Sequence, residues 1–116
     1  MYQKVTLIGN LGQDPELRYL ATGDGVCNLS LATNRKYAKN GETITETCWF
    51  KVTVWGKTAE ACNQYLRKGS KVLIEGHLSP DPETGSPKLF TRKDGTSGAS
   101  YEIRAESVKF LDTKDD

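Results

Sequence analysis

Two tryptophans, Trp49 and Trp55, are the residues whose type and spacing point most directly to chemistry. They lie in the segment TCWFKVTVW (47–55), where apolar residues alternate with others as they do along a half-buried strand. One side of this strand is wholly apolar, whereas the other carries both tryptophans with Lys51 between them. Large rings that face water gain nothing from burial unless something covers them. Two rings flanking a cation suit single-stranded nucleic acid, because bases stack on rings and phosphate pairs with an ammonium group.

The alternation by itself leaves another interpretation open, in which both rings pack under a loop or in a subunit interface. Further aromatic residues among cations favour nucleic acid. Tyr37 stands among the basic residues of RKYAK (35–39), and Phe90 stands among the basic residues of a later Gly/Pro-rich stretch. The residues that these observations predict to form a stacking platform in a positive groove are Arg35, Tyr37, Trp49, Lys51, Trp55, Lys57, Phe90 and Arg92.

Five strands and one helix are expected to position these side chains. Apolar alternation bounded by turn residues predicts strands over about 2–10, 26–37, 45–55, 71–78 and 101–111. Asn40-Gly41 predicts a hairpin turn between the second and third strands, because both residues tolerate positive φ. In the last strand the apolar parity switches between Ala105 and Val108, which predicts a bulge or bend there.

The helix is predicted over about 58–68, where apolar residues recur on one face at helical spacing. Glu60 near its start, and Arg67 and Lys68 near its end, match the helix macrodipole. Gly69 is expected to end the helix.

This element order predicts an all-β protein, a five-stranded OB-fold barrel with one helix between the third and fourth strands. The segments 11–25 and 79–100, rich in Gly, Pro and polar residues, are expected to be connecting loops. A small sandwich or an SH3-like barrel fits the same pattern. The OB-fold domain is expected to cover residues 1–111, and residues 112–116 are expected to form a short, acidic, disordered C-terminal end.

Length and charge narrow the class of protein. A chain of 116 residues fits one domain, because chains divide into several domains only well beyond this length. The net charge of +1 is unevenly spread: residues 35–71 carry eight basic and three acidic side chains, whereas 1–34 and 72–116 carry net charges of −1 and −3. A basic middle between acidic flanks can prepare one face for a polyanion, although an unevenly charged solvated surface would give the same pattern.

Motifs for catalysis, metals and cofactors are absent from the sequence. Three widely spaced cysteines and one histidine cannot supply a structural zinc site, and they predict buried, reduced thiols in a cytosolic protein. Gly23–Asn28 begins like a dinucleotide fingerprint but lacks the third glycine. No apolar run approaches the ~18 residues of a membrane span, and the N-terminus has no secretory pattern. We therefore expect a cytoplasmic protein that is not an enzyme and has no cofactor and no metal.

Four blocks of sequence occur in a familiar order: IGNLGQDPELRY (8–19), LSLATNRKY (29–37), WFKVTVWGKTAE (49–60) and YLRKGSKVLIEGHL (65–78). Together they resemble the bacterial-type single-stranded DNA-binding proteins. The resemblance runs from about residue 4 to residue 111, and the combination of blocks is more specific than any one of them.

The resemblance implies an OB-fold that assembles as a homotetramer and wraps single-stranded DNA without sequence preference. It also implies protection of replication, recombination and repair intermediates, association with the bacterial nucleoid and no catalytic activity; a phage or organelle source stays open. The family's stacking aromatics match Tyr37, Trp49, Trp55 and Phe90, and its phosphate contacts match Lys4, Lys51, Lys57 and Lys68.

Three features depart from the family pattern. Residues 79–88 look like an insertion before Phe90, and Phe50 stands where relatives often have a polar residue, which implies a more apolar subunit interface. The chain stops at Asp116, where family members usually continue to an acidic tip that recruits replication and repair proteins, so this recruitment is not visible in the sequence. Two other functions stay open: an adaptor that grips a protein partner with its aromatic face, and an RNA-binding OB-fold.

Overall fold

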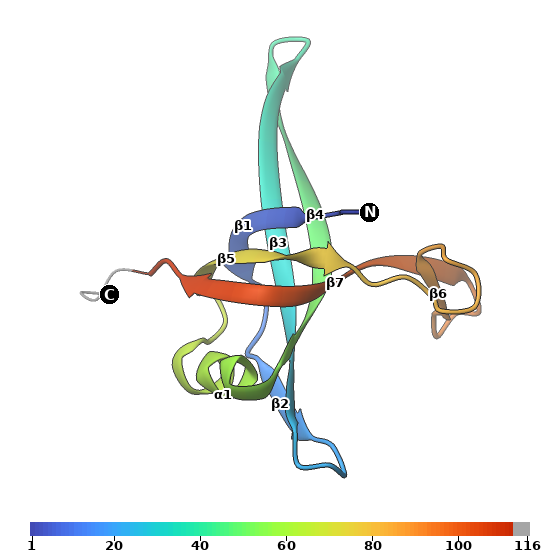
Figure 1. The fold of residues 1–116 in the computed structure, drawn as a ribbon. Coiled ribbons are helices and arrows are strands. Elements are labelled where there is room, and N and C mark those ends of the chain that lie inside the picture. The colour runs from blue at the N-terminus through green and yellow to red at the C-terminus, as the bar shows by residue number, and fades with distance from the viewer. Residues whose placement is uncertain (113–116) are drawn as a thin grey trace.

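A computed structural model describes residues 1–112, which form seven strands and one helix (Figure 1). The elements in chain order are β1 (Val5–Leu11), β2 (Glu16–Tyr19), β3 (Gly25–Lys39), β4 (Glu42–Trp55), α1 (Gly56–Tyr65), β5 (Lys71–Leu78), β6 (Lys88–Thr91) and β7 (Ser97–Phe110). Of the C-terminal end expected to be disordered, residues 113–116 lie outside the described residues. Asp112 accepts a hydrogen bond through Oδ1 from the backbone N–H of Lys71 at 3.1 Å.

Five of the strands close into a barrel. β1 pairs with β5, β5 with β7, β7 with β4 and β4 with β3, and Asn10 and Leu11 of β1 pair back onto β3. These pairings are antiparallel except for β4–β7, which is parallel. α1 follows β4 and precedes β5, so it lies between the third and fourth barrel strands. The predicted OB-fold is confirmed over the sandwich and SH3-like alternatives.

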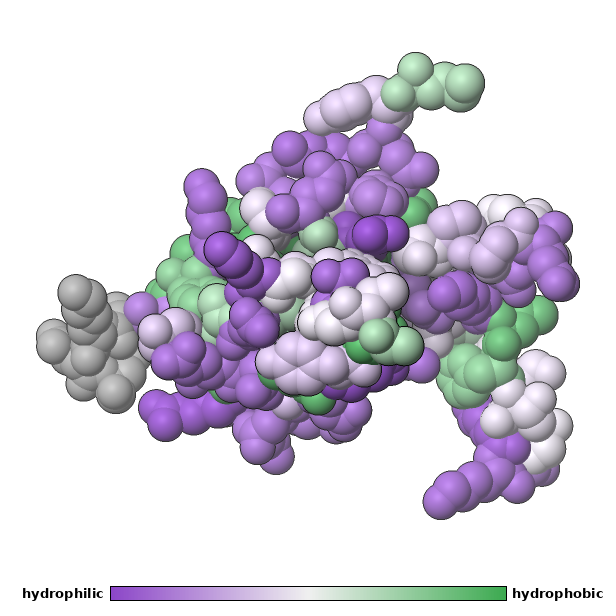
Figure 2. Space-filling model, turned by 60° about the horizontal axis from the view of Figure 1, so that its bottom comes forward, coloured by the Kyte–Doolittle hydropathy of each residue, from purple (hydrophilic) through white to green (hydrophobic). Residues whose placement is uncertain are grey.

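Alternation along the strands places one face of each strand inside the barrel. Val52 and Val54 of β4 are 1% exposed, and Leu31, Ile74 and Ile103 from β3, β5 and β7 are equally buried. Figure 2 turns the end with α1 and β2 forward and shows a mostly hydrophilic surface, with hydrophobic side chains in separate smaller areas. The core is therefore a single cluster inside the barrel and under the helix.

The helix begins and ends earlier than the predicted 58–68. α1 starts at Gly56, directly after β4, and Leu66 already has an extended backbone with φ −101° and ψ 154°. The Leu66 side chain is buried in the core, which holds the chain away from another helical turn. The first turn therefore holds no acidic residue and the last turn no basic residue, and the predicted match to the macrodipole is wrong. No helix in the described part of the chain is long and apolar enough to cross a membrane.

The predicted role of Gly69 as the end of the helix is also wrong. Gly69 has a φ of 93° and lies in the turn that leads from α1 into β5. Its backbone N–H donates to the carbonyl oxygen of Leu11 at 2.8 Å, so this turn is fastened to the end of β1.

Two four-residue strands lie in segments expected to be loops. β2 pairs with β3, and β6 pairs with the first part of β7. Each of these strands has four residues, too few for an alternating pattern to indicate a strand, and pairing with a long neighbour supplies its hydrogen bonds. Residues 88–100 form a hairpin, here called the β6–β7 arm, which projects from the barrel (Figure 1).

β3 and β4 form a long hairpin whose far end also projects from the barrel (Figure 1). The two strands pair without a register shift from Val26 opposite Trp55 to the turn. Asn40 and Gly41 have φ values of 53° and 80°, which confirms the predicted turn.

The bulge predicted between Ala105 and Val108 is present in β7. Glu75 pairs with Ser107 and Gly76 pairs with Ala105, so Glu106 is an extra residue without a cross-strand partner. The extra residue accounts for the switch in apolar parity that the sequence contains.

The three cysteines are free thiols. Cys27 and Cys62 are buried as predicted, whereas the prediction of burial is wrong for Cys48, which is partly exposed. Burial raises the pKa of Cys62 to about 12 and also raises the pKa of Cys27. Both thiols therefore stay protonated near neutral pH and act as small apolar side chains.

Candidate nucleic-acid interface

Both tryptophans of β4 face outward. Trp49 is 53% exposed and Trp55 is 38% exposed, whereas the valines between them in sequence face the core. The alternation predicted for 47–55 is therefore confirmed, and an interior position for the rings within one subunit is excluded. Because β4 pairs with β3 without a bulge, both rings lie on the same side of the strand.

Trp49 lines an open cavity together with residues of the β6–β7 arm. The cavity has a volume of about 400 Å³, and its walls include Trp49, Lys51, Phe90, Arg92 and Ser30. The Lys51 Nζ lies 5.1 Å, and the Arg92 Cζ 5.4 Å, from the centroid of the Phe90 ring. Two cations therefore contact the Phe90 ring, and four of the site residues predicted from sequence meet in one place.

Two glycines, Gly12 and Gly98, let the rings of Trp49 and Phe90 pack directly against the backbone. A Cβ built on Gly12 would lie 2.4 Å from Cζ3 of Trp49, and a Cβ built on Gly98 would lie 2.6 Å from Cζ of Phe90. Any side chain at either position would displace the ring. The segment after β1 and the first part of β7 thus fix where the two rings stand.

A second hollow continues the first along the outer face of β4. It has a volume of about 450 Å³ and shares Ser30 and Lys51 with the first cavity. Apart from Leu29, its remaining walls combine polar and charged side chains: Gln13, Glu16, Arg18, Asn28, Thr53, Lys88 and Glu102. We call the two hollows together the β4 groove. The two carboxylates make it less positive than the sequence predicts, because β2 and β7, which carry them, were not expected to form its walls.

Arg104, which is not among the predicted site residues, contacts the ring of Trp55. The Cζ of Arg104 lies 4.9 Å from the centroid of the Trp55 ring, which is the range of a cation–π contact. Arg104 is exposed on β7, which pairs with β4 in parallel so that Thr53 and Arg104 are opposite. The available signal was its parity: Arg104 follows the inward-facing Ile103 and must face outward.

Tyr37 and Arg35 lie apart from the β4 groove. The Arg35 Cζ is 5.2 Å from the centroid of the Tyr37 ring, and its Nε is 3.8 Å from Oε1 of Glu46. Tyr37 pairs with Ile44, and Ile44 is five residues from Trp49 along β4. Because side chains alternate along a strand, this odd separation puts Tyr37 on the opposite face of the hairpin from Trp49.

Lys57 lies just after β4 and Lys68 lies between α1 and β5, and neither lines the β4 groove. Lys57 is exposed two residues after Trp55, in the first turn of α1. Lys68 is exposed in the turn before β5, and its backbone N–H donates to Oδ1 of Asp14 at 2.8 Å. That bond fastens the turn to the segment that also contains Gly12, against which Trp49 packs.

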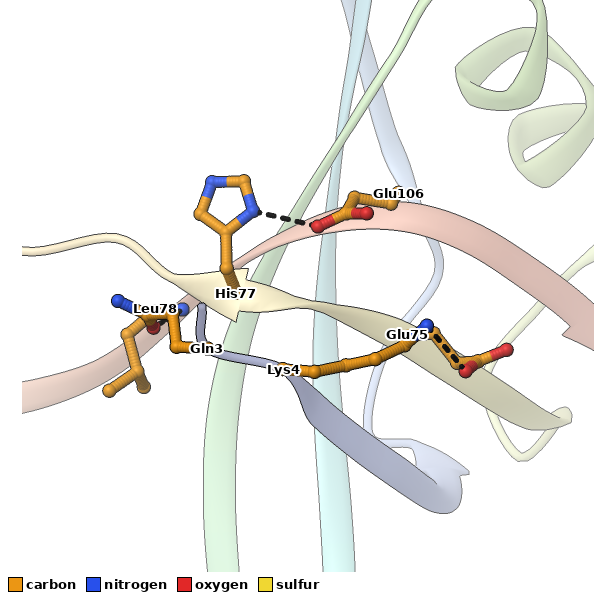
Figure 3. Close-up of polar contacts among 6 residues, drawn as sticks. All are labelled: Gln3, Lys4, Glu75, His77, Leu78 and Glu106. Carbon is orange, nitrogen blue, oxygen red and sulfur yellow. Dashed lines mark hydrogen bonds and ion pairs between the residues drawn. The ribbon is translucent and has the colours of Figure 1, made fainter. Parts of the chain in front are cut away.

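Lys4 directly precedes β1 and is held in an ion pair. Its Nζ is 3.2 Å from Oε2 of Glu75, and this contact raises the pKa of Lys4. Figure 3 shows this pair beside a second one, in which Nδ1 of His77 lies 3.0 Å from Oε1 of Glu106. The neighbourhood of Lys4 is thus of mixed charge, unlike the cavity beside Trp49. Among residues 1–112, no three potential metal ligands come together.

The fold and the groove together define a class: an OB-fold protein whose outer strand face carries exposed rings and cations. Comparison with known proteins gives the family. Residues 2–111 match the single-strand binding protein family, and the chain belongs to that family.

Curated relatives carry the name single-stranded DNA-binding protein. The relative from Wolinella succinogenes is 43% identical over 98% of this chain and 67% of its own length. The relative from Helicobacter hepaticus is 44% identical over 98% of this chain and 64% of its own length. The relative from Neisseria meningitidis serogroup A is 39% identical over 93% of this chain and 59% of its own length. The chain thus spans about three fifths to two thirds of the length of these relatives, and the family resemblance of its sequence is confirmed.

Proposed function

We propose that this chain binds single-stranded DNA without sequence preference and holds the strand in the β4 groove. The observation that carries the proposal is the open cavity in which the half-exposed ring of Trp49 stands beside Lys51, Phe90 and Arg92. The name that the relatives share supports the same function.

Bases and phosphates are held by different groups in this proposal. Bases stack on aromatic rings, and every base has a face that can stack. Phosphates pair with cations beside the rings and release condensed counterions. Neither contact depends on which base is present, so binding is independent of sequence, and no chemical step is involved. The proposed contacts are the rings of Tyr37, Trp49, Trp55 and Phe90 and the cations of Lys4, Arg35, Lys51, Lys57, Lys68 and Arg92.

Arg35 and Tyr37, on the β3–β4 hairpin, contact a DNA strand that is longer than the groove alone can hold. Trp49 and Trp55 are six residues apart, about 20 Å at the rise of a strand. A strand that leaves the groove past Trp49 has to pass an edge of the β3–β4 hairpin to reach Tyr37 on its other face. At Lys4, phosphate has to compete with Glu75 for the ammonium group.

Assembly into a homotetramer is part of the same proposal. β1 pairs with β5 from Val5 to Asn10 but with β3 at Asn10 and Leu11 alone, so the edge of residues 5–9 that faces away from β5 has no partner strand within residues 1–112. Ile8 is 52% exposed there. An unpaired edge with an exposed apolar side chain favours pairing with a second copy of the chain.

The proposed place of action is the cytoplasm, where single strands arise during replication, recombination and repair. The protein covers such strands and protects them until another protein takes over.

The experiment that tests the proposal replaces Trp49 by alanine and measures affinity for a labelled oligo-dT by fluorescence anisotropy. We expect the dissociation constant to rise about 5- to 150-fold, which corresponds to about 1–3 kcal/mol per base stack, a range obtained from single-strand binding OB-folds themselves. Tyr65→Ala is the matched control, because Tyr65 is 65% exposed on α1 and lies outside the groove.

Equal affinities of wild type and Trp49→Ala would contradict the proposed groove. Tighter binding of oligo-U than of oligo-dT would point to RNA instead, since contacts to the 2′-hydroxyl are what favour RNA over DNA. Loss of affinity in Tyr65→Ala to the same extent would mean that the loss reports general instability rather than the groove.

A further inference from the structure

We propose that Arg104 is a further DNA-binding residue, which covers the Trp55 ring in the free protein and moves to phosphate when a base stacks there. This inference rests on the proposed function and adds to it a residue that is not among the predicted site residues. Its starting observation is the guanidinium carbon 4.9 Å from the centroid of the Trp55 ring.

The charge of Arg104 is free to bind an anion. None of the ion pairs among residues 1–112 includes Arg104. The carboxylates two residues away on either side are both engaged elsewhere: Glu102 with Lys88 at 3.2 Å and Glu106 with His77 at 3.0 Å. Figure 3 shows Glu106 turned toward His77. Arg104 therefore rests on the indole, because no carboxylate holds it.

The position of Arg104 lets it reach both a stacked base and the backbone of the strand. Arg104 stands opposite Thr53, and Thr53 lines the β4 groove two residues before Trp55. A guanidinium group binds phosphate through several N–H donors in a fixed fork, whereas its contact with a ring is weaker and exposed to water. Exchange of the ring for phosphate is therefore favourable once a strand lies in the groove, and it uncovers the ring for a base.

The rings of Trp49, Trp55 and Phe90 differ in the cations that contact them. In the part of the chain that the structure describes, Phe90 is contacted by Lys51 and Arg92, Trp55 by Arg104, and Trp49 by no cation. The Trp55 end of the groove thus differs from the Trp49 end, because a base reaches Trp55 only after a cation has moved.

The first test compares the salt dependence of oligo-dT binding in wild type, Arg104→Ala and Arg104→Lys. Loss of one phosphate contact lowers the slope of log K against log salt concentration by about 0.7 for single strands, which is about fivefold in affinity at 0.1 M salt relative to 1 M salt. We expect this loss in Arg104→Ala and a wild-type slope in Arg104→Lys, which keeps the charge. Lys109→Ala is the matched control, because it removes one exposed charge from the same strand outside the groove.

The second test uses Trp49→Phe, in which Trp55 is the one remaining tryptophan. We expect oligo-dT to quench its emission with Arg104 present and also in Trp49→Phe/Arg104→Ala, because the ring becomes accessible in both. Quenching confined to the protein without Arg104 would mean that the guanidinium covers the ring permanently, and the proposal would be overturned.

The two proposals fail in different ways. If wild type does not bind oligo-dT at all, the proposed function itself is wrong. If wild type binds and Arg104→Ala has the same slope and affinity, or loses no more than Lys109→Ala does, then the inference about Arg104 alone is wrong.

Discussion

At the scale of single residues, the surroundings of each ring decide how it can serve a ligand. Trp49 packs against Gly12 at a distance that leaves no room for a Cβ, and more than half of the residue is exposed. The glycine thus has a positional role that depends on space rather than on an unusual backbone angle. The backbone at Gly12 fixes the position of the Trp49 ring, and the exposed part of the ring is accessible to a base.

Gly12→Ala is therefore expected to weaken oligo-dT binding with little change in stability. The new methyl group would lie 2.4 Å from Cζ3 of Trp49, so the ring has to move, whereas no buried side chain is disturbed. Anisotropy titration gives the affinity and thermal unfolding gives the stability. The double variant Gly12→Ala/Trp49→Ala supplies the control, because the two losses should not add if they act through the same ring. Additive losses would show that Gly12 acts on binding independently of Trp49.

At the scale of elements, the proposed binding residues are divided between two projecting hairpins and the barrel wall. The β6–β7 arm brings Phe90 and Arg92 to the face of β4 that carries Trp49. The β3–β4 hairpin carries Tyr37 on the face opposite Trp49. Short and long strands of DNA should therefore use different sets of residues.

Tyr37→Ala tests this division. OB-folds bind about 4–16 nucleotides each, and a strand at the lower end of that range can occupy the β4 groove without reaching the hairpin. We expect Tyr37→Ala to leave the affinity for such a short oligo-dT unchanged and to weaken binding of one well above the range. Trp49→Ala, measured alongside, should weaken both. An equal loss for both lengths in Tyr37→Ala would place Tyr37 at the same site as Trp49.

The elements that the sequence predicted correctly are those with strong patterns. The alternation of β4, the Asn40-Gly41 turn and the parity switch around Glu106 each have a local physical cause. β2 and β6 were missed because each is four residues long and exists by pairing with a longer strand. For the same reason the carboxylates of the groove and the contact of Arg104 with Trp55 were missed: both depend on strand neighbours that are distant in sequence.

At the scale of the whole molecule, the proposed contacts with DNA and with a second copy of the chain use different strands of the barrel, β4 and β1. The β4 groove lies on the outer face of β4, whereas the unpaired edge of β1 continues from the two residues that pair with β3. In the proposed assembly the barrel pairs with a second copy through the backbone of this edge, and the groove uses outward-facing side chains of β4. Phe50, with its ring centroid 5.7 Å from that of Tyr101, packs within the subunit.

Ile8→Glu is expected to shift the protein from the proposed tetramer to smaller species. A carboxylate at this half-exposed position of β1 would be buried without a partner if a second β1 strand packed there. Sedimentation velocity at micromolar concentration measures the species present. Leu89→Glu, on the β6–β7 arm at 75% exposure, provides the control. A wild-type protein that sediments as a monomer would rule out the assembly.

The central claim is that bases stack on the outward-facing indoles of β4, and the emission of Trp49 and Trp55 during titration with oligo-dT tests it most directly. Stacking is expected to quench the emission until the groove is saturated, and salt should restore it as phosphate contacts are lost. Unchanged emission at a concentration where anisotropy reports full binding would contradict the claim.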